Sequence, residues 1–183
     1  NVICQKPLAP SLEDAREMVR ACAEAGVLFM VHENFRWQSP MRACKNESAR
    51  TGNLFFLRIT FRSCFDVYAR QPYLRDEKRF ILYDLGVHLL DLARFFMGEF
   101  KSLYCRTMRV NPDIAGEDTA TVMLNTAGGA TCIVEMSYAS KTEELFPQTL
   151  VHPEGEDGSV TLGPHYALSG VVHDTVIKKS AKP

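Results

Sequence analysis

The chain has 183 residues, of which 46% are hydrophobic and 23% are charged, close to the usage of about 45–50% and 25% in globular proteins. This length allows one domain to bury a core without disulfides or metal ions. The formal net charge is −1, and no run of five or six like charges occurs. The charge pattern therefore indicates neither a nucleic acid nor a membrane surface as a partner.

The cysteines and the hydropathy pattern bear on the compartment. The chain has six cysteines, and they never form a Cys-x-x-Cys pair, so the sequence predicts neither a zinc site nor a redox dithiol. No apolar run approaches the roughly 18–20 residues that span a bilayer, and no charged-then-apolar leader opens the chain. We therefore expect a cytoplasmic protein, since widely spaced cysteines without a dithiol motif fit a reducing compartment.

The first third of the chain predicts a strand, a helix and a second strand. Residues 1–4 form a short extended run. Ser11 is a candidate helix N-cap with Asp14 in the first turn, and Gly26 supplies the C-terminal stop. The apolar run 27–31 is typical of a strand that is buried on both faces, as in a parallel sheet covered by helices.

The middle of the chain predicts two further helices around one strand. Pro40 can start a helix that ends at Gly52. Residues 54–61 are rich in Phe, Leu and Ile and predict a strand. The connection 62–79 is longer than the common 2–6 residues, which favours a folded or functional loop. A helix then begins near Asp84 and stops at Gly98.

The rest of the chain predicts mainly strands. Gly128 and Gly129 are placed to turn a hairpin, and the predicted strands span 101–110, 119–125, 130–137 and 148–152. The order of elements predicts an α/β fold grading into α+β.

Three ionisable residues share one side of the helix that begins near Asp84. Asp84 and His88 are four residues apart, and Asp91 follows three later, so the three are neighbours on the helix. A carboxylate beside an imidazole suits proton transfer near neutral pH, with His88 as the acid/base. Two alternatives stay open: Asp84 caps the helix while His88 is a hydrogen-bonded core histidine, or all three residues bind a divalent metal ion.

Further polar residues follow the two predicted N-terminal strands. Lys6 comes at the end of the first strand, and His32, Asn34 and Arg36 follow the second, where open α/β sheets place their ligands. Lys6 could polarise a hydroxyl or carbonyl, and Arg36 suits an anion or a sugar hydroxyl. The alternatives are an exposed lysine at a turn before Pro7 and a solvated strand exit.

Three segments in this order resemble the Gfo/Idh/MocA oxidoreductase family. They are Cys4-Gln5-Lys6-Pro7-Leu8-Ala9, His32-Glu33-Asn34-Phe35-Arg36-Trp37 and Asp84-Leu85-Gly86-Val87-His88-Leu89-Leu90-Asp91. The resemblance implies that residues 1–33 are the last strand-helix-strand part of an N-terminal Rossmann domain. Residues 34–183 would then form the C-terminal domain for substrate binding and oligomerisation, with a large, mostly antiparallel sheet covered by helices on one face.

The resemblance also implies an activity, namely hydride transfer between NAD or NADP and a CH–OH or carbonyl group of a sugar-like, polyol or dihydrodiol substrate. The implied catalytic residues are Lys6, Asp84 and His88. Lys6, Pro7 and Arg36 would bind the cofactor, Asn34, Arg36, Asp84 and His88 would bind the substrate, and no metal site is expected. The chain departs from the family pattern at Gln5, where members usually have Glu.

The chain contains no Gly-x-Gly-x-x-Gly motif, the turn that cradles a dinucleotide in Rossmann folds. We therefore expect these 183 residues alone to bind dinucleotide poorly and to be inactive. A rival hypothesis is a non-catalytic oligomerisation or interaction module derived from such an enzyme. The resemblance implies a homo-oligomer through the C-terminal sheet in either case.

Overall fold

The computed structural model describes residues 1–142 and 148–181. The chain divides into two compact units, Asn1–Asn34 and Phe35–Pro183. We call them the N-terminal and the C-terminal unit and describe each by itself.

The N-terminal unit is a strand-helix-strand motif. Strand β1 (Val2–Gln5) pairs in parallel with β2 (Phe29–His32), and helix α1 (Leu12–Glu24) connects them. The Ser11 hydroxyl accepts a hydrogen bond from the Asp14 backbone N–H at 3.1 Å, which confirms the predicted cap. Two parallel strands joined by a helix form the repeating unit of Rossmann folds.

The burial predicted for the second strand is wrong in this chain. Leu28 and Met30 are 75% and 52% exposed. Among the described residues, this sheet contains only β1 and β2. The one helix of the unit cannot cover both faces of this sheet, so residues of β2 stay exposed.

The C-terminal unit is built on an eight-stranded sheet with the order β10-β9-β8-β7-β3-β6-β5-β4. Among the strands that the structure describes, only β3 and β6 pair in parallel, and the other neighbours are antiparallel, as expected for a mostly antiparallel sheet. The strands are β3 (Leu54–Arg62), β4 (Ser102–Met108), β5 (Thr119–Asn125), β6 (Thr131–Ser137), β7 (Leu150–Gly155), β8 (Gly158–Leu162), β9 (Ala167–Val172) and β10 (Thr175–Ser180). The sequence prediction ended at 148–152 and so missed the last three, which are short and lack a sustained apolar alternation.

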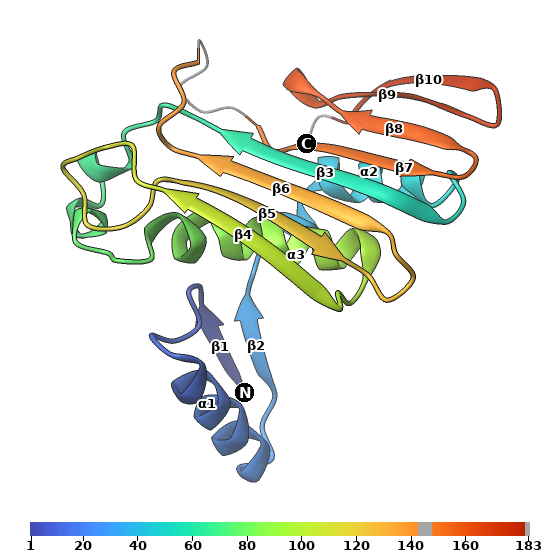
Figure 1. Cartoon of the computed structure of the whole chain (residues 1–183). Helices are drawn as coiled ribbons and strands as arrows, with labels where there is room; N and C mark the ends of the chain where they lie inside the picture. Colours follow the sequence, from blue (N-terminus) through green and yellow to red (C-terminus); the bar gives the residue numbers. More distant parts are fainter. Residues whose placement is uncertain (143–147, 182–183) are drawn as a thin grey trace. The chain divides into compact units, whose positions relative to one another are not determined.

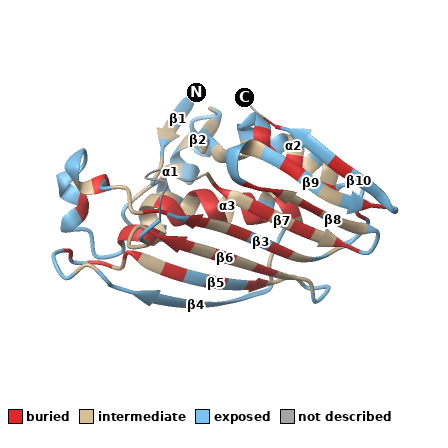
Figure 2. Ribbon diagram, turned by 90° about the horizontal axis from the view of Figure 1, so that it is seen from above, coloured by how far each residue is buried: buried red, intermediate tan, exposed pale blue. Residues whose placement is uncertain are grey.

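Helices α2 (Ser39–Ser48) and α3 (Val87–Met97) lie against one face of this sheet (Figure 1). Helix α2 contacts β7 and β8, whereas α3 contacts β3 and β6. Buried residues alternate with less buried ones along strands such as β5 and β7 (Figure 2), because only alternate residues face the helices. Among the described residues, no helix combines the length and apolar character needed to cross a membrane.

Helix α2 ends earlier than predicted, because the backbone after Ser48 turns out of the helix before Gly52. The Arg50 and Thr51 N–H groups donate to the carbonyls of Glu47 and Ser48, at 3.0 and 3.1 Å. Gly52 itself has a φ of 77°, which glycine adopts without steric cost.

The long connection between β3 and α3 is folded rather than extended. It contains two short 3₁₀ helices, Val67–Ala69 and Pro72–Arg75. Val67 and Leu74 pack with Phe80 and Ile114 into a second, smaller apolar cluster. The segment therefore has a core of its own, which explains why it could be long without a helical or strand period.

The packing of α3 on the sheet predicts a large stability loss on truncation of Leu92. This side chain is fully buried, so Leu92→Ala should lower the free energy of unfolding by about 2–5 kcal/mol. Leu103→Ala, at a leucine that is 66% exposed, is the matched control and should have little effect. Urea denaturation followed by circular dichroism measures both. Equal losses for the two variants would contradict the packing described here.

Candidate active site

In the N-terminal unit, the polar residues singled out by the sequence lie at or just after the carboxyl ends of the two strands. Gln5 and His32 are register partners at the carboxyl ends of β1 and β2. The Gln5 amide Nε2 lies 3.4 Å from His32 Nδ1, and its Oε1 accepts the Lys6 N–H at 3.1 Å. Lys6 and Asn34 thus follow neighbouring strand ends, where open α/β sheets bind ligands.

In the C-terminal unit, Asp84 lies in a π-helical turn, Leu82–Gly86, directly before α3. The helical backbone begins upstream of this turn, at Phe80. Asp84 is therefore inside the helix and not at its N-cap, so the capping alternative is wrong. The wider π turn redirects a side chain relative to a regular helix, and such turns occur frequently at functional sites.

Glu117 anchors the start of the π-helical turn. Its backbone carbonyl accepts the N–H of Ile81 at 3.1 Å, and its carboxylate accepts the N–H of Leu82 at 3.4 Å. Because the N–H groups at a helix start lack partners within the helix, these bonds stabilise the place at which the turn begins.

Tyr138 holds the Asp84 carboxylate. Its hydroxyl donates a hydrogen bond to Asp84 Oδ2 at 3.0 Å. The Tyr138 ring stacks on Phe80, with centroids 5.5 Å apart, and meets Phe61 edge-on at 6.3 Å. Burial and the nearby Asp84 charge raise the pKa of Tyr138 well above its usual range. The phenol therefore remains protonated and donates to Asp84 at all physiological pH values.

His88 is buried in the first turn of α3, with 7% of its surface exposed. Its imidazole stacks on the Phe35 ring, with centroids 4.1 Å apart and an angle of 9° between the planes. The Phe35 ring covers one face of the imidazole, whereas the two nitrogens lie on the ring edge. The contact thus limits rotation of the ring without occupying the atoms that exchange protons.

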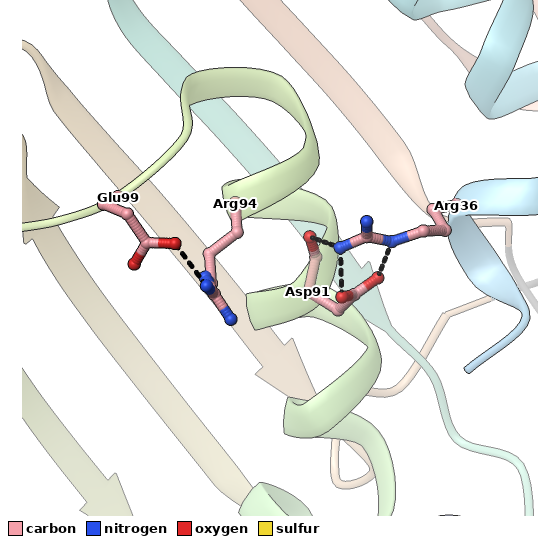
Figure 3. A network of polar contacts seen from close by, with 4 residues as sticks. All are labelled: Arg36, Asp91, Arg94 and Glu99. Carbon is pink, nitrogen blue, oxygen red and sulfur yellow. Dashed lines mark hydrogen bonds and ion pairs between the residues drawn. The ribbon is translucent and has the colours of Figure 1, made fainter. Parts of the chain in front are cut away.

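Arg36 and Asp91 form a two-point ion pair (Figure 3). Arg36 Nε donates to Asp91 Oδ2 at 2.6 Å, and one terminal nitrogen donates to Oδ1. Among the described residues, no group of three or more His, Cys, Asp or Glu side chains is arranged to hold a metal ion. The alternative of a metal site from Asp84, His88 and Asp91 is not formed, because the Asp91 carboxylate faces a guanidinium.

The C-terminal unit therefore gathers four of the predicted residues, Arg36, Asp84, His88 and Asp91, on or against one helix. Lys6, Pro7 and Asn34 belong to the N-terminal unit. Sequence reasoning missed Phe35 and Tyr138 as parts of the site. Phe35 lies within the second segment that carries the family resemblance, and Tyr138 follows directly after a predicted strand, and these were the signals that could have identified them.

The environment of Tyr138 predicts its behaviour in an alkaline titration. Its raised pKa means that Tyr138→Phe should not reduce the phenolate absorbance that develops up to the onset of alkaline unfolding. Tyr73→Phe, at an exposed tyrosine, should remove the signal of one of the six tyrosines. Ultraviolet difference spectroscopy at about pH 10–11, near the ordinary tyrosine pKa, measures both. Loss of one phenolate in the Tyr138 variant would contradict a buried, Asp84-bound phenol.

Two family models match the chain. Residues 45–161 match the GFO/IDH/MocA C-terminal domain, and residues 1–33 match the oxidoreductase family with an NAD-binding Rossmann fold. The first match covers most of the C-terminal unit. The second covers nearly all of the N-terminal unit, in agreement with its parallel strand-helix-strand motif.

Individual relatives agree with these models. D-apiose dehydrogenases from Rhizobium rhizogenes and Paraburkholderia graminis are 52% and 51% identical to this chain over 91% of its length. The matched regions are 49% and 45% of the lengths of those two proteins. A crystal structure of an Agrobacterium radiobacter oxidoreductase in complex with NAD⁺, L-tartaric acid and magnesium is 48% identical. It superimposes with a TM-score of 0.95 over 99% of this chain and 54% of that chain.

The chain thus spans about half the length of the curated relatives it matches. The sequence motifs, the eight-stranded sheet with helices on one face and the family models agree. The chain belongs to the GFO/IDH/MocA oxidoreductase family.

Proposed function

We propose that the full-length protein is an NAD- or NADP-dependent dehydrogenase that oxidises a CH–OH group of a sugar-like or polyol substrate, or reduces the corresponding carbonyl. The observation that carries this proposal is the arrangement on α3. A buried histidine follows one turn after Asp84, and the Asp84 carboxylate is held by the Tyr138 hydroxyl. The names of the similar proteins support the same reaction class.

In this proposal His88 is the general acid/base. It accepts the proton of the substrate hydroxyl while the hydride leaves the carbon that bears this hydroxyl. In the reverse direction it returns a proton to the oxygen. Asp84 orients the imidazole and stabilises its protonated form, as carboxylates beside histidines do. Lys6 polarises the reacting oxygen, which becomes a carbonyl as the carbon loses its hydride.

The N-terminal unit has groups that fit a nicotinamide dinucleotide. Lys6, Pro7 and Asn34 follow the carboxyl ends of two parallel strands, the place where dinucleotides bind in such sheets. When bound, NAD or NADP accepts or supplies the hydride. Contacts of Asn34 and Arg36 with cofactor or substrate stay predictions, as does the division of the chain into a Rossmann part, 1–33, and a substrate domain, 34–183.

A branched pentose is the substrate class that the relatives favour, because two proteins more than half identical to this chain carry the name D-apiose dehydrogenase. We therefore propose D-apiose as the first substrate to assay, with myo-inositol and D-xylose as comparators of similar polarity. Formation of NADH or NADPH, followed by absorbance at 340 nm, also decides the cofactor preference.

Replacement of His88 tests the proposed reaction directly. In the full-length protein, His88→Gln should lower kcat on the order of 10²–10⁴-fold, the usual contribution of general acid/base catalysis. NADH binding, followed by fluorescence, should be retained. His173→Asn, at an exposed histidine in the turn after β9, is the control and should keep full turnover. Undiminished turnover in His88→Gln would refute the assignment.

We further propose a cytoplasmic homo-oligomer that associates through the sheet face opposite the helices. The six cysteines are unpaired, in keeping with a reducing compartment. By strand register, Tyr104 and Met123 lie opposite each other on β4 and β5, on the face away from the helices, and they are 58% and 39% exposed. Apolar and aromatic surface of this kind is enriched in the cores of subunit interfaces.

This association predicts the effect of charge on the sheet face. The double variant Tyr104→Lys/Met123→Lys should sediment as a smaller species than the unmodified protein, because burying two ammonium groups in an apolar interface is unfavourable. Tyr73→Lys, at an exposed tyrosine outside the sheet, should leave the oligomer intact. Analytical ultracentrifugation distinguishes the species. An unchanged oligomer in the double variant would exclude this face.

A further inference from the structure

Two contacts attach the 3₁₀ turn Phe35–Trp37 to helix α3. The first is the stack of the Phe35 ring on the His88 imidazole. The second is the ion pair between Arg36 and Asp91. Phe35 and Arg36 are adjacent in the chain, and His88 and Asp91 are three residues apart and hence neighbours on the helix surface. The two contacts therefore join the same two segments within one helical turn.

The geometry of the Arg36–Asp91 ion pair restricts the orientation of Arg36 relative to α3. The Arg36 guanidinium presents two parallel N–H groups to the two Asp91 oxygens, and its terminal nitrogen also reaches the Asp91 backbone carbonyl at 3.4 Å. A planar fork of this kind specifies an angle as well as a distance. The side chains are 32% and 21% exposed, so solvent weakens the pair less than it weakens a surface ion pair.

The Arg36 side chain has a further neighbour on α3. Its guanidinium carbon lies 5.6 Å from the centroid of the Phe95 ring. Asp91 and Phe95 are four residues apart and therefore lie on one side of the helix. Arg36 thus spans two successive turns of α3, and a shift of the 3₁₀ turn along the helix would break both interactions.

We infer that Arg36 and Asp91 are positioning residues for His88 and that they act on it through Phe35. The ion pair keeps the 3₁₀ turn at one height along α3, and the Phe35 ring then sets the plane of the imidazole. This inference rests on the proposed function of His88. It replaces direct contact of Arg36 with substrate or cofactor by an indirect role, and the two roles predict different kinetics.

The same helix offers a matched control. Arg94 pairs with Glu99 near the end of α3 (Figure 3), but these side chains are 58% and 79% exposed. Both pairs join an arginine to a carboxylate, and both involve α3. Only the pair with Asp91 is attached to the segment that carries Phe35. Arg94→Met therefore reports what the loss of an ordinary helix ion pair does to the protein.

The experiment measures two quantities in the full-length protein: the NMR chemical shifts of the His88 ring and the rate of turnover. Histidine labelled with ¹³C gives ring CH signals, and the His88 signals are those missing from His88→Gln. The stacked Phe35 ring should shift them upfield. In Arg36→Met and in Asp91→Asn this shift should shrink, and Phe35→Leu should abolish it. Arg94→Met should leave it unchanged. Thermal melts confirm that each variant is folded, and Arg36→Lys provides a conservative second variant.

The kinetics should follow the ring signals. Arg36→Met and Asp91→Asn should each lower kcat about ten- to a hundred-fold, the effect expected of a small misplacement of a catalytic group, with little change in KM. The double variant should be no slower than the slower single variant, because both changes break one interaction. Arg36→Lys should behave like Arg36→Met, since an ammonium cannot form the fork.

Each contrary result is informative. A raised KM with unchanged kcat and an unchanged ring shift in Arg36→Met would show that Arg36 binds a ligand directly, and would overturn the inference alone. A lost ring shift with unchanged kcat would also overturn the positioning role. Full turnover in His88→Gln would instead refute the proposed function, whatever the ring signals show.

Discussion

The packing of α3 against strands β3 and β6 is the constraint on which the candidate site depends. Leu85, Leu89, Leu92 and Phe96 form a buried stripe along the helix and the turn before it. Burial of such a stripe removes apolar surface from water and defines the rotation of the helix about its axis. Once that rotation is defined, Asp84, His88 and Asp91 can only lie on the neighbouring face. The chemistry of the site is therefore a consequence of core packing.

Two kinds of contact then refine the positions that the packing allows. Tyr138 reaches Asp84 from the end of β6, and Phe35 and Arg36 reach α3 from the 3₁₀ turn before α2. The carboxylate and the imidazole are thus held from different parts of the chain. The proposed catalytic roles of Asp84 and His88 need such support, because side chains that are held by packing lose little entropy when a substrate binds.

The C-terminal unit also has a division of labour across its sheet. One face is covered by α2 and α3 and carries the apolar core, whereas the opposite face displays Tyr104 and Met123. The eight strands thus support the candidate active site on one face and offer a proposed association surface on the other. The small apolar cluster around Phe80 packs against Tyr138. The long connection after β3 contributes Val67 and Leu74 to this cluster and so helps to support Tyr138.

The sequence by itself determined the elements that depend on local patterns. The cap at Ser11, the stop at Gly98 and the apolar stripe of α3 were all predictable, because capping and helical periodicity act over a few residues. The same periodicity placed Asp84 and His88 in one helical segment, but it did not predict the π-helical turn that contains Asp84. Short strands β8 to β10 were missed, because strand formation depends on neighbours that are distant in sequence.

Only the tertiary structure decided which distant side chains meet. No local pattern indicates that Tyr138 donates to Asp84 across 54 residues or that Arg36 pairs with Asp91 across 55 residues. Both contacts arise because the sheet and the 3₁₀ turn are packed on the same helix. Spacing in the sequence shows which groups can share a face, but long-range packing selects their partners, because those partners come from segments whose approach no local preference encodes.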